Sequence, residues 1–150
     1  LVQALKGDAP MMRQNAAIIL GVVRDERALP ALKEVFEDPN ESPEVKMYAA
    51  EALKRITGEE LLKLKSAKEY YYQLAENYYY AHPAVMGTFY GEYLVWQWDA
   101  ENKKVSMRVM QDFIFNEELA EDACYRALAK DAHYGPVWPL LVCIYLSRYY

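Results

Sequence analysis

Residues 8–58 read DAPMMRQNAAIILGVVRDERALPALKEVFEDPNESPEVKMYAAEALKRITG, and this stretch decides the fold because it states one pattern twice. When Pro10–Val23 is moved along by 33 residues, from position 10 to position 43, it falls on Pro43–Ile56. The residues shared in this register are Pro10 and Pro43, Arg13 and Lys46, Ala16-Ala17 and Ala49-Ala50, and Leu20 and Leu53. A repeat at this period is typical of helical solenoids, in which each unit buries its apolar face against its neighbours.

The first copy predicts a pair of helices. Asp8 is the expected N-cap of the first helix, and Pro10 suits its first turn. The apolar stripe of this helix comprises Met12, Ala16, Ile19, Leu20 and Val23. Asp25 is expected to cap the second helix, and Pro30 lies early enough in that helix to be tolerated. The inward stripe of the second helix comprises Leu29, Leu32, Val35 and Phe36.

The second copy predicts a third helix, which Ser42 and Pro43 open after a turn at residues 38–42. Its inward stripe comprises Val45, Ala49, Ala52, Leu53 and Ile56. Gly58 is expected to end this helix, because glycine readily adopts the left-handed conformation that a helix end favours. Residues 59–65 are then expected to form a short partner helix.

The order of proline, basic residue, two alanines and leucine, closed by Asp25–Pro30, resembles the HEAT-repeat family, in particular its short bacterial, bilin-lyase-like form. The resemblance covers residues 1–65 and implies a right-handed α-solenoid of helix pairs that binds protein partners. Thr57-Gly58 stands where the first copy has Arg24-Asp25, which is typical of the last unit of an array. Leu1–Leu5 reads like the tail of a further repeat, so we expect the sequence to be a fragment of a larger repeat protein.

The second half has a different composition, because thirteen of the fourteen tyrosines and all three tryptophans follow residue 65. We therefore predict a boundary that separates HEAT-like repeats at 1–65 from an aromatic-rich helical region at 66–150. Ser66 and Glu69 form a capping box that opens a helix. One face of this helix is expected to carry Tyr71, Leu74, Ala75 and Tyr78.

Near the end of the chain, Asn116 is expected to cap a helix, and Trp138 to lie in the core of the next one. The inward residues of these two helices are Ala120, Cys124, Ala127 and Leu128, followed by Trp138, Leu141 and Tyr145. This order of small and bulky residues over residues 116–149 resembles the second helix of one tetratricopeptide (TPR) repeat and the first helix of the next. The resemblance implies that the helical solenoid continues, HEAT-like first and TPR-like afterwards.

A possible β-hairpin insertion is predicted around residues 92–110, between these helical parts. Glu92–Trp98 and Val105–Val109 have the composition and alternation of strands, and Asp99–Asn102 would make the turn. A helix over Ala84–Trp98 is the alternative.

Charge and motifs exclude several classes of function. The net charge of −5 argues against a nucleic-acid partner, and no apolar run approaches the roughly 20 residues of a membrane span. His82 and His133 are isolated and there is no His-Glu dipeptide, so metal-binding HEAT hydroxylases are not expected as relatives. Cys124 is expected at a packing position without a base beside it. The two cysteines leave the compartment open.

Five aromatic residues are the candidate partner-binding site. Tyr72, Tyr79 and Tyr80 cannot all be buried on one helix face, while Trp96 and Trp98 point from one side of the predicted strand. We predict that these residues form an exposed patch that anchors an extended peptide or a partner helix. Their burial under the remainder of a longer protein is the other interpretation.

The sequence therefore predicts a non-catalytic protein–protein interaction or scaffolding module with no catalytic residue, no metal and no cofactor, because neither repeat family implies a reaction. The alternative is a HEAT protein that handles a small ligand. Short HEAT arrays include tetrapyrrole lyase or isomerase subunits, and a tyrosine-rich cleft could also stack a planar ligand or a glycan.

Overall fold

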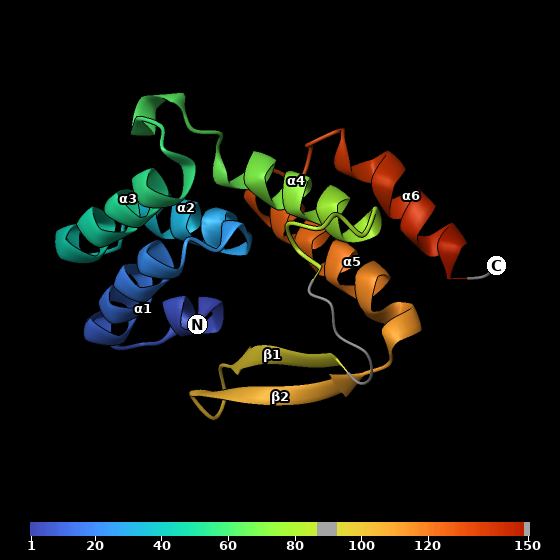
Figure 1. Cartoon of the computed structure of the whole chain (residues 1–150), viewed down its shortest axis with the longest axis horizontal. Coiled ribbons are helices and arrows are strands. Elements are labelled where there is room, and N and C mark those ends of the chain that lie inside the picture. Colours follow the sequence, from blue (N-terminus) through green and yellow to red (C-terminus); the bar gives the residue numbers. More distant parts are fainter. Residues whose placement is uncertain (87–92, 149–150) are drawn as a thin grey trace. The chain divides into compact units, whose positions relative to one another are not determined.

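The computed structural model describes residues 1–86 and 93–148, and it is mainly helical with one antiparallel β-hairpin (Figure 1). The elements are η1 (Val2–Lys6), α1 (Pro10–Val23), η2 (Glu26–Ala28), α2 (Leu29–Glu37), α3 (Pro43–Thr57), η3 (Leu61–Lys63), α4 (Ala67–Tyr79), β1 (Tyr93–Asp99), β2 (Lys104–Met110), α5 (Asp112–Lys130) and α6 (Val137–Ser147), where η marks a 3-10 helix. The predicted helical class and the hairpin are confirmed. The first residue of the predicted hairpin, Glu92, lies outside the described residues.

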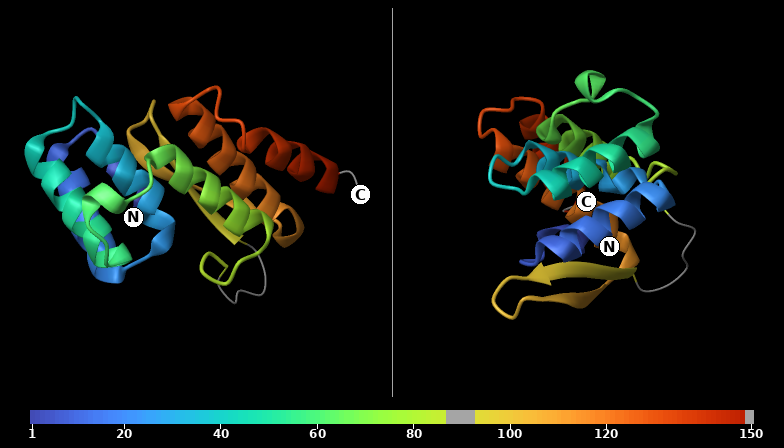
Figure 2. Two further views of the ribbon diagram at one scale, coloured as in Figure 1. Left: turned by 90° about the horizontal axis from the view of Figure 1, so that it is seen from above. Right: turned by 90° about the vertical axis from the view of Figure 1, so that its left-hand side faces the viewer.

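The chain divides into two compact units. Unit 1 comprises Leu1–Lys65 and Val95–Arg108, and unit 2 comprises Ser66–Leu94 and Val109–Tyr150. In unit 1, α1 and α2 both pack against α3, and the three helices lie side by side (Figure 2). The buried residues of these helices include Ala16, Ala17, Leu20, Leu32, Val35, Val45, Ala49, Ala52 and Leu53. The predicted stripes of α2 and α3 are thus confirmed, with Leu29, Phe36 and Ile56 partly buried against the same core.

The predicted stripe of α1 is wrong at two positions. Ile19 and Val23 are exposed, whereas Ala17 and Gly21 are buried. The reason is the close approach of two helices: a Cβ atom placed on Gly21 would lie 2.9 Å from Ala52 Cα. α1 therefore approaches α3 most closely at its smallest residues, and Ile19 and Val23 turn outward.

This contact makes Gly21→Ala a sensitive test of the packing of unit 1. In an exposed helix the change would raise stability by about 0.5–1 kcal/mol. Here the added methyl meets the backbone of Ala52, so we expect the free energy of unfolding to fall by about 1–3 kcal/mol. Chemical denaturation followed by circular dichroism measures this change, with Asn15→Ala on the exposed side of α1 as the control. A gain in stability would show that the two helices are farther apart.

The observed helix ends agree only in part with the caps predicted from the sequence. Ser42 accepts a hydrogen bond from Val45 N (3.3 Å), and Gly58 is left-handed at φ 71°, as predicted. Asp25 accepts one from Arg27 N (3.0 Å), but it caps the 3-10 helix η2, and the N-cap of α2 is Ala28. Asp8 is not the N-cap of α1, because that place belongs to Ala9, which directly precedes Pro10. The predicted helix at 59–65 is a single 3-10 turn, because so few residues between Gly58 and the next cap cannot offset the cost of helix nucleation.

In unit 2, α4 packs along α5, and α6 packs against α5. The capping box of α4 is confirmed, since Ser66 N donates to the Glu69 carboxylate (2.8 Å). The buried core of unit 2 consists of Tyr71, Ala75, Ala120, Ala123, Cys124, Ala127, Val137, Leu140, Leu141 and Ile144. Leu74, Tyr78 and Leu128 are partly buried against it, so the predicted inward faces of α4 and α5 are confirmed.

Three predictions for unit 2 are wrong. Asn116 is not a cap, because α5 begins one turn earlier at Asp112, with Gln111 in the N-cap position. Trp138 is 53% exposed and Tyr145 is 37% exposed, whereas both were expected in the core. α6 instead buries Val137, Leu140 and Ile144 together with Leu141, which is the predicted inward residue that is confirmed. The C-terminal residue of the TPR-like stretch, Tyr149, lies outside the described residues.

Candidate interaction surfaces

The five predicted aromatic anchors fall into two groups. Tyr72, Tyr79 and Tyr80 belong to unit 2, whereas Trp96 and Trp98 belong to the hairpin in unit 1. Each group has its own surroundings and its own degree of exposure. We therefore describe the two groups separately, each within its own unit.

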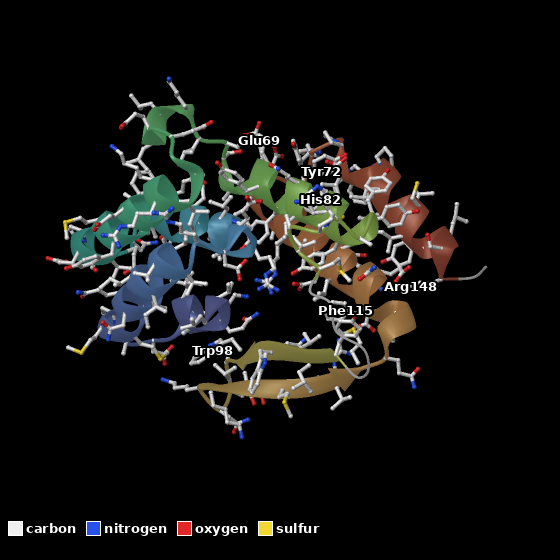
Figure 3. All side chains as sticks on the ribbon, in the orientation of Figure 1. Glu69, Tyr72, His82, Trp98, Phe115 and Arg148 are labelled. Atoms are coloured by element: carbon white, nitrogen blue, oxygen red, sulfur yellow. The ribbon has the colours of Figure 1, made fainter. Side chains whose placement is uncertain are left out.

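Tyr72 on α4 is half-buried and held by its neighbours (Figure 3). Its ring meets Tyr134 edge-on, with ring centroids 5.9 Å apart, and its hydroxyl donates to Glu76 (2.9 Å). Burial and the Glu76 carboxylate raise the pKa of Tyr72 to about 12. Lys68 lies over the Tyr134 ring at 5.2 Å and pairs with Asp131 at 2.7 Å. Tyr72 thus stabilises unit 2 and offers a partner only part of its ring.

Tyr79 and Tyr80 differ from each other. The Tyr79 hydroxyl lies 3.1 Å from Ser147 Oγ and links the end of α4 to the end of α6. Tyr80 is 71% exposed, and its ring stands edge-on to Tyr79 with centroids 5.0 Å apart. Of the three predicted tyrosines, Tyr80 presents the most surface to a partner.

The hairpin carries an apolar surface that is larger than the two predicted tryptophans. Its strands are of equal length, and Ser106 Oγ donates to Gln97 O (3.4 Å), which places residue 97 opposite residue 106. Because successive side chains of a strand alternate between faces, one face then holds only apolar side chains. We call it the apolar hairpin face, and it comprises Leu94, Trp96, Trp98, Val105, Met107 and Val109. Trp98 is half-buried, and the other five are exposed.

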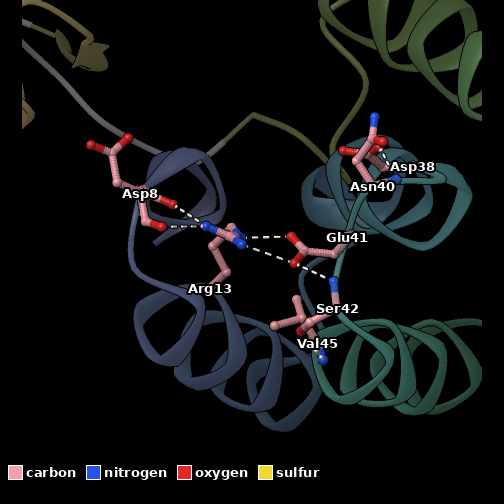
Figure 4. A network of polar contacts seen from close by, with 8 residues as sticks. Asp8, Arg13, Asp38, Asn40, Glu41, Ser42 and Val45 are labelled. Carbon is pink, nitrogen blue, oxygen red and sulfur yellow. Dashed lines mark hydrogen bonds and ion pairs between the residues drawn. The ribbon is translucent and has the colours of Figure 1, made fainter.

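A polar network in unit 1 was not foreseen from the sequence (Figure 4). Arg13 donates through Nε and Nη2 to the Glu41 carboxylate (2.6 and 2.9 Å) and through Nη1 to the carbonyls of Gly7 and Asp8 (2.6 and 2.9 Å). Ser42 N donates to the same carboxylate (2.7 Å). The network ties the segment before α1 to the turn before α3.

The electrostatics of this network are those of a partly buried ion pair. The side chains of Arg13 and Glu41 are 18% and 7% exposed. Hydrogen bonding to Arg13 lowers the pKa of Glu41, and the same contact raises the pKa of Arg13. Since each of the three nitrogens of the Arg13 guanidinium already donates to an acceptor in the protein, this residue positions the two loops.

A cavity of about 550 Å³ lies beside the network. Its lining residues are Leu5, Lys6, Gly7, Asp8, Arg13, Ala31, Glu34, Val35, Asp38, Asn40 and Glu41. Asp38 accepts a hydrogen bond from Asn40 N (2.9 Å) and so shapes the turn at its rim. The lining contains neither histidine nor cysteine. It consists mainly of charged and amide side chains, with a few small apolar residues.

The remaining side chains that could bind a metal or act as a nucleophile do not form a site. Within residues 1–86 and 93–148, no group of three or more His, Cys, Asp or Glu side chains could hold a metal ion. Cys124 is buried, and burial raises the pKa of its thiol to about 12, while Cys143 is exposed. In the same part of the chain, no helix has the length and apolar character to cross a membrane.

Comparisons with known proteins bear on the first half of the chain. Residues 1–67 match the family model described as HEAT repeats. A stretch of 62 residues is 36% identical to the deoxyhypusine hydroxylase of Homo sapiens, and it covers 41% of this chain and 20% of that protein. The chain thus spans about a fifth of that relative's length. No solved structure matches the chain significantly.

These matches settle two predictions. The exclusion of HEAT hydroxylases as relatives is wrong, because the similarity to a hydroxylase lies in the repeat sequence, whereas the exclusion relied on a missing His-Glu dipeptide. The resemblance of residues 1–65 to HEAT repeats is confirmed by the family match over residues 1–67.

Proposed function

We propose that the chain is a non-catalytic protein-interaction module. HEAT repeats generally mediate protein interactions, and residues 1–67 match that family. The observation that carries the proposal is that stripes of large apolar side chains remain exposed after each unit has built its core, as is typical of interaction sites. These exposed residues are Met11, Ile19, Val22 and Val23 on α1, the apolar hairpin face apart from Trp98, and Trp138, Val142 and Leu146 on α6.

The surface of α6 has the composition of a partner-binding site. Trp138, Val142 and Leu146 follow one another at intervals of four residues and so lie on one side of the helix; we call them the α6 stripe. Beside it, Tyr145 donates to Glu121 (2.6 Å), and Arg148 pairs with Glu121 (2.6 Å). An apolar centre with a tryptophan and a polar rim is the usual anatomy of a protein interface.

The α6 stripe fits an apolar groove on a partner protein, because anchors spaced by four residues on one helix match helix-in-groove recognition. Tyr80 would add a second aromatic anchor in unit 2.

Site-specific photo-crosslinking tests the proposal. A photoreactive amino acid replaces Trp138 in one sample of the chain and Ala129, an exposed residue of α5 outside the stripe, in a matched control. After irradiation in a lysate of the source organism, we expect a discrete protein adduct from position 138 and none from position 129.

Two results would contradict the proposal. One is the same set of adducts from both positions, which would indicate non-specific contact. The other is no adduct from position 138 together with a rise in melting temperature on adding a tetrapyrrole or a glycan. That second result would favour the small-ligand alternative.

A further inference from the structure

The hairpin keeps one face free of charge, whereas its opposite face holds charged residues together with apolar ones, among them Val95 and the buried Met110. In the register that places residue 97 opposite residue 106, the apolar hairpin face carries no charged or polar side chain. The charged residues of the two strands, Asp99, Lys104 and Arg108, belong to the opposite face. The turn is fixed independently, because the backbone and side-chain amides of Asn102 both donate to the Asp99 carboxylate (3.0 and 2.8 Å).

An uncovered face of this kind is unusual in a two-stranded sheet. Two strands alone are marginally stable in water and gain stability when their apolar face is packed against another layer. The exposed fractions of Leu94, Trp96, Val105, Met107 and Val109 are between 40% and 52%. Taking about 150–250 Å² for a whole aromatic side chain and less for an aliphatic one, the face presents about 500 Å² of apolar surface. That is as large as the largest patch of a typical monomer.

We propose that this face pairs with the same face of a second copy of the chain. Two copies together would bury about 1,000 Å², which is below the roughly 1,200–2,000 Å² of stable interfaces and within the range of weak ones. Since the face holds no charge, the two copies meet without burying one. The contact is isologous, with a twofold axis through the centre of the face.

The geometry of the pair follows from ordinary sheet packing. Two twisted sheets stack about 10 Å apart with their strands about 30° from parallel. Trp96 and Met107 lie opposite each other in the register, at the middle of both strands. They therefore occupy the centre of the proposed interface, where substitutions have their largest effects.

Sedimentation velocity over a wide range of protein concentration tests the proposal. We expect the weight-average mass to rise reversibly from 17.4 kDa toward twice that value, because so small an interface gives a weak dimer. Trp96→Lys places a charge at the centre of the face and should weaken association at least about tenfold. Gln97→Lys introduces the same side chain one residue away on the opposite face and should leave association within about twofold.

A second variant separates weakened association from unfolding of the hairpin. Met107→Lys makes the same change from β2, and circular dichroism and hydrogen exchange of the strands show whether each variant keeps its hairpin. A wild-type chain that stays at 17.4 kDa at every concentration overturns the proposal, as does equal association of wild type and a folded Trp96→Lys variant.

Other occupants of the face would give different results. A monomeric wild type that binds lipid vesicles, or that crosslinks from position 96 to another protein, would assign the face to that partner and overturn the pairing of two copies. The proposal concerns the apolar hairpin face alone, so its failure leaves the α6 stripe, which the crosslinking experiment tests separately, as a partner-binding site.

Discussion

Ile144→Ala is expected to lower the free energy of unfolding of unit 2 by about 2–5 kcal/mol. Ile144 is fully buried in the cluster that joins α6 to α5 and α4. Removing its outer carbons takes apolar surface out of a packed core and leaves a cavity among side chains that cannot close over it completely. Urea denaturation followed by circular dichroism measures the change as a lower midpoint with an unchanged slope.

The matched control is Trp138→Ala on the same helix. It removes a larger side chain, yet we expect a loss below about 1 kcal/mol, because Trp138 is 53% exposed. The order of these two effects distinguishes the two possible orientations of α6. If Trp138→Ala were the more damaging change, Trp138 would be buried as the TPR-like pattern predicts, and the orientation of α6 described above would be wrong.

Arg13→Gln is expected to lower the free energy of unfolding of unit 1 by about 2–3 kcal/mol. Breaking a fully buried ion pair costs about 3–5 kcal/mol, and the loss is smaller here because Arg13 keeps some contact with water. The change leaves Glu41 charged and nearly buried, and it removes the donor to the carbonyls of Gly7 and Asp8. Lys46→Gln is the comparison, since Lys46 holds the equivalent position in the second copy and acts on Glu41 only through its charge; its loss should be clearly smaller than that of Arg13→Gln.

The effect of Arg13→Gln should depend on pH. The pKa of Glu41 in the folded chain is below its ordinary value of 4.5, so its contribution to stability is fully present above pH 4.5. This contribution is lost as the pH falls through the lower folded pKa. Thermal denaturation should therefore show a large difference between wild type and Arg13→Gln at pH 7, and a smaller one below pH 4. A constant difference would mean that the Glu41 carboxylate is not the group that the substitution affects.

The sequence predicts where the helices lie better than which side of each faces inward. α6 has apolar residues all around, so periodicity identifies a helix without choosing between the side of Trp138 and the side of Ile144. In α1 the larger residues suggested the inward side, whereas the approach to α3 is made through Ala17 and Gly21. Such choices depend on the neighbouring helix, which a single-helix pattern does not contain.

The candidate interaction surfaces were also predictable only where they depend on local sequence. Alternation predicted the hairpin and the shared side of Trp96 and Trp98, because a strand's period is local. The packing of Tyr72 against Tyr134 joins distant parts of the sequence, and nothing near Tyr72 indicates it. The Arg13–Glu41 pair is separated by 28 residues, and each partner has an ordinary local explanation, as a repeat position and as a turn residue.

The prevalence of alanine between the helices has a consequence for the response of the protein to temperature. Where α1 meets α3 and where α4 meets α5, the buried residues include Ala16, Ala17, Ala49, Ala52, Ala75, Ala120, Ala123 and Ala127. Each contributes a single methyl, so unfolding exposes less apolar side-chain area than in a core of leucines. The heat capacity change of unfolding should then lie at the low end of the usual range of about 12–15 cal/mol/K per residue, which gives a broad and shallow dependence of stability on temperature.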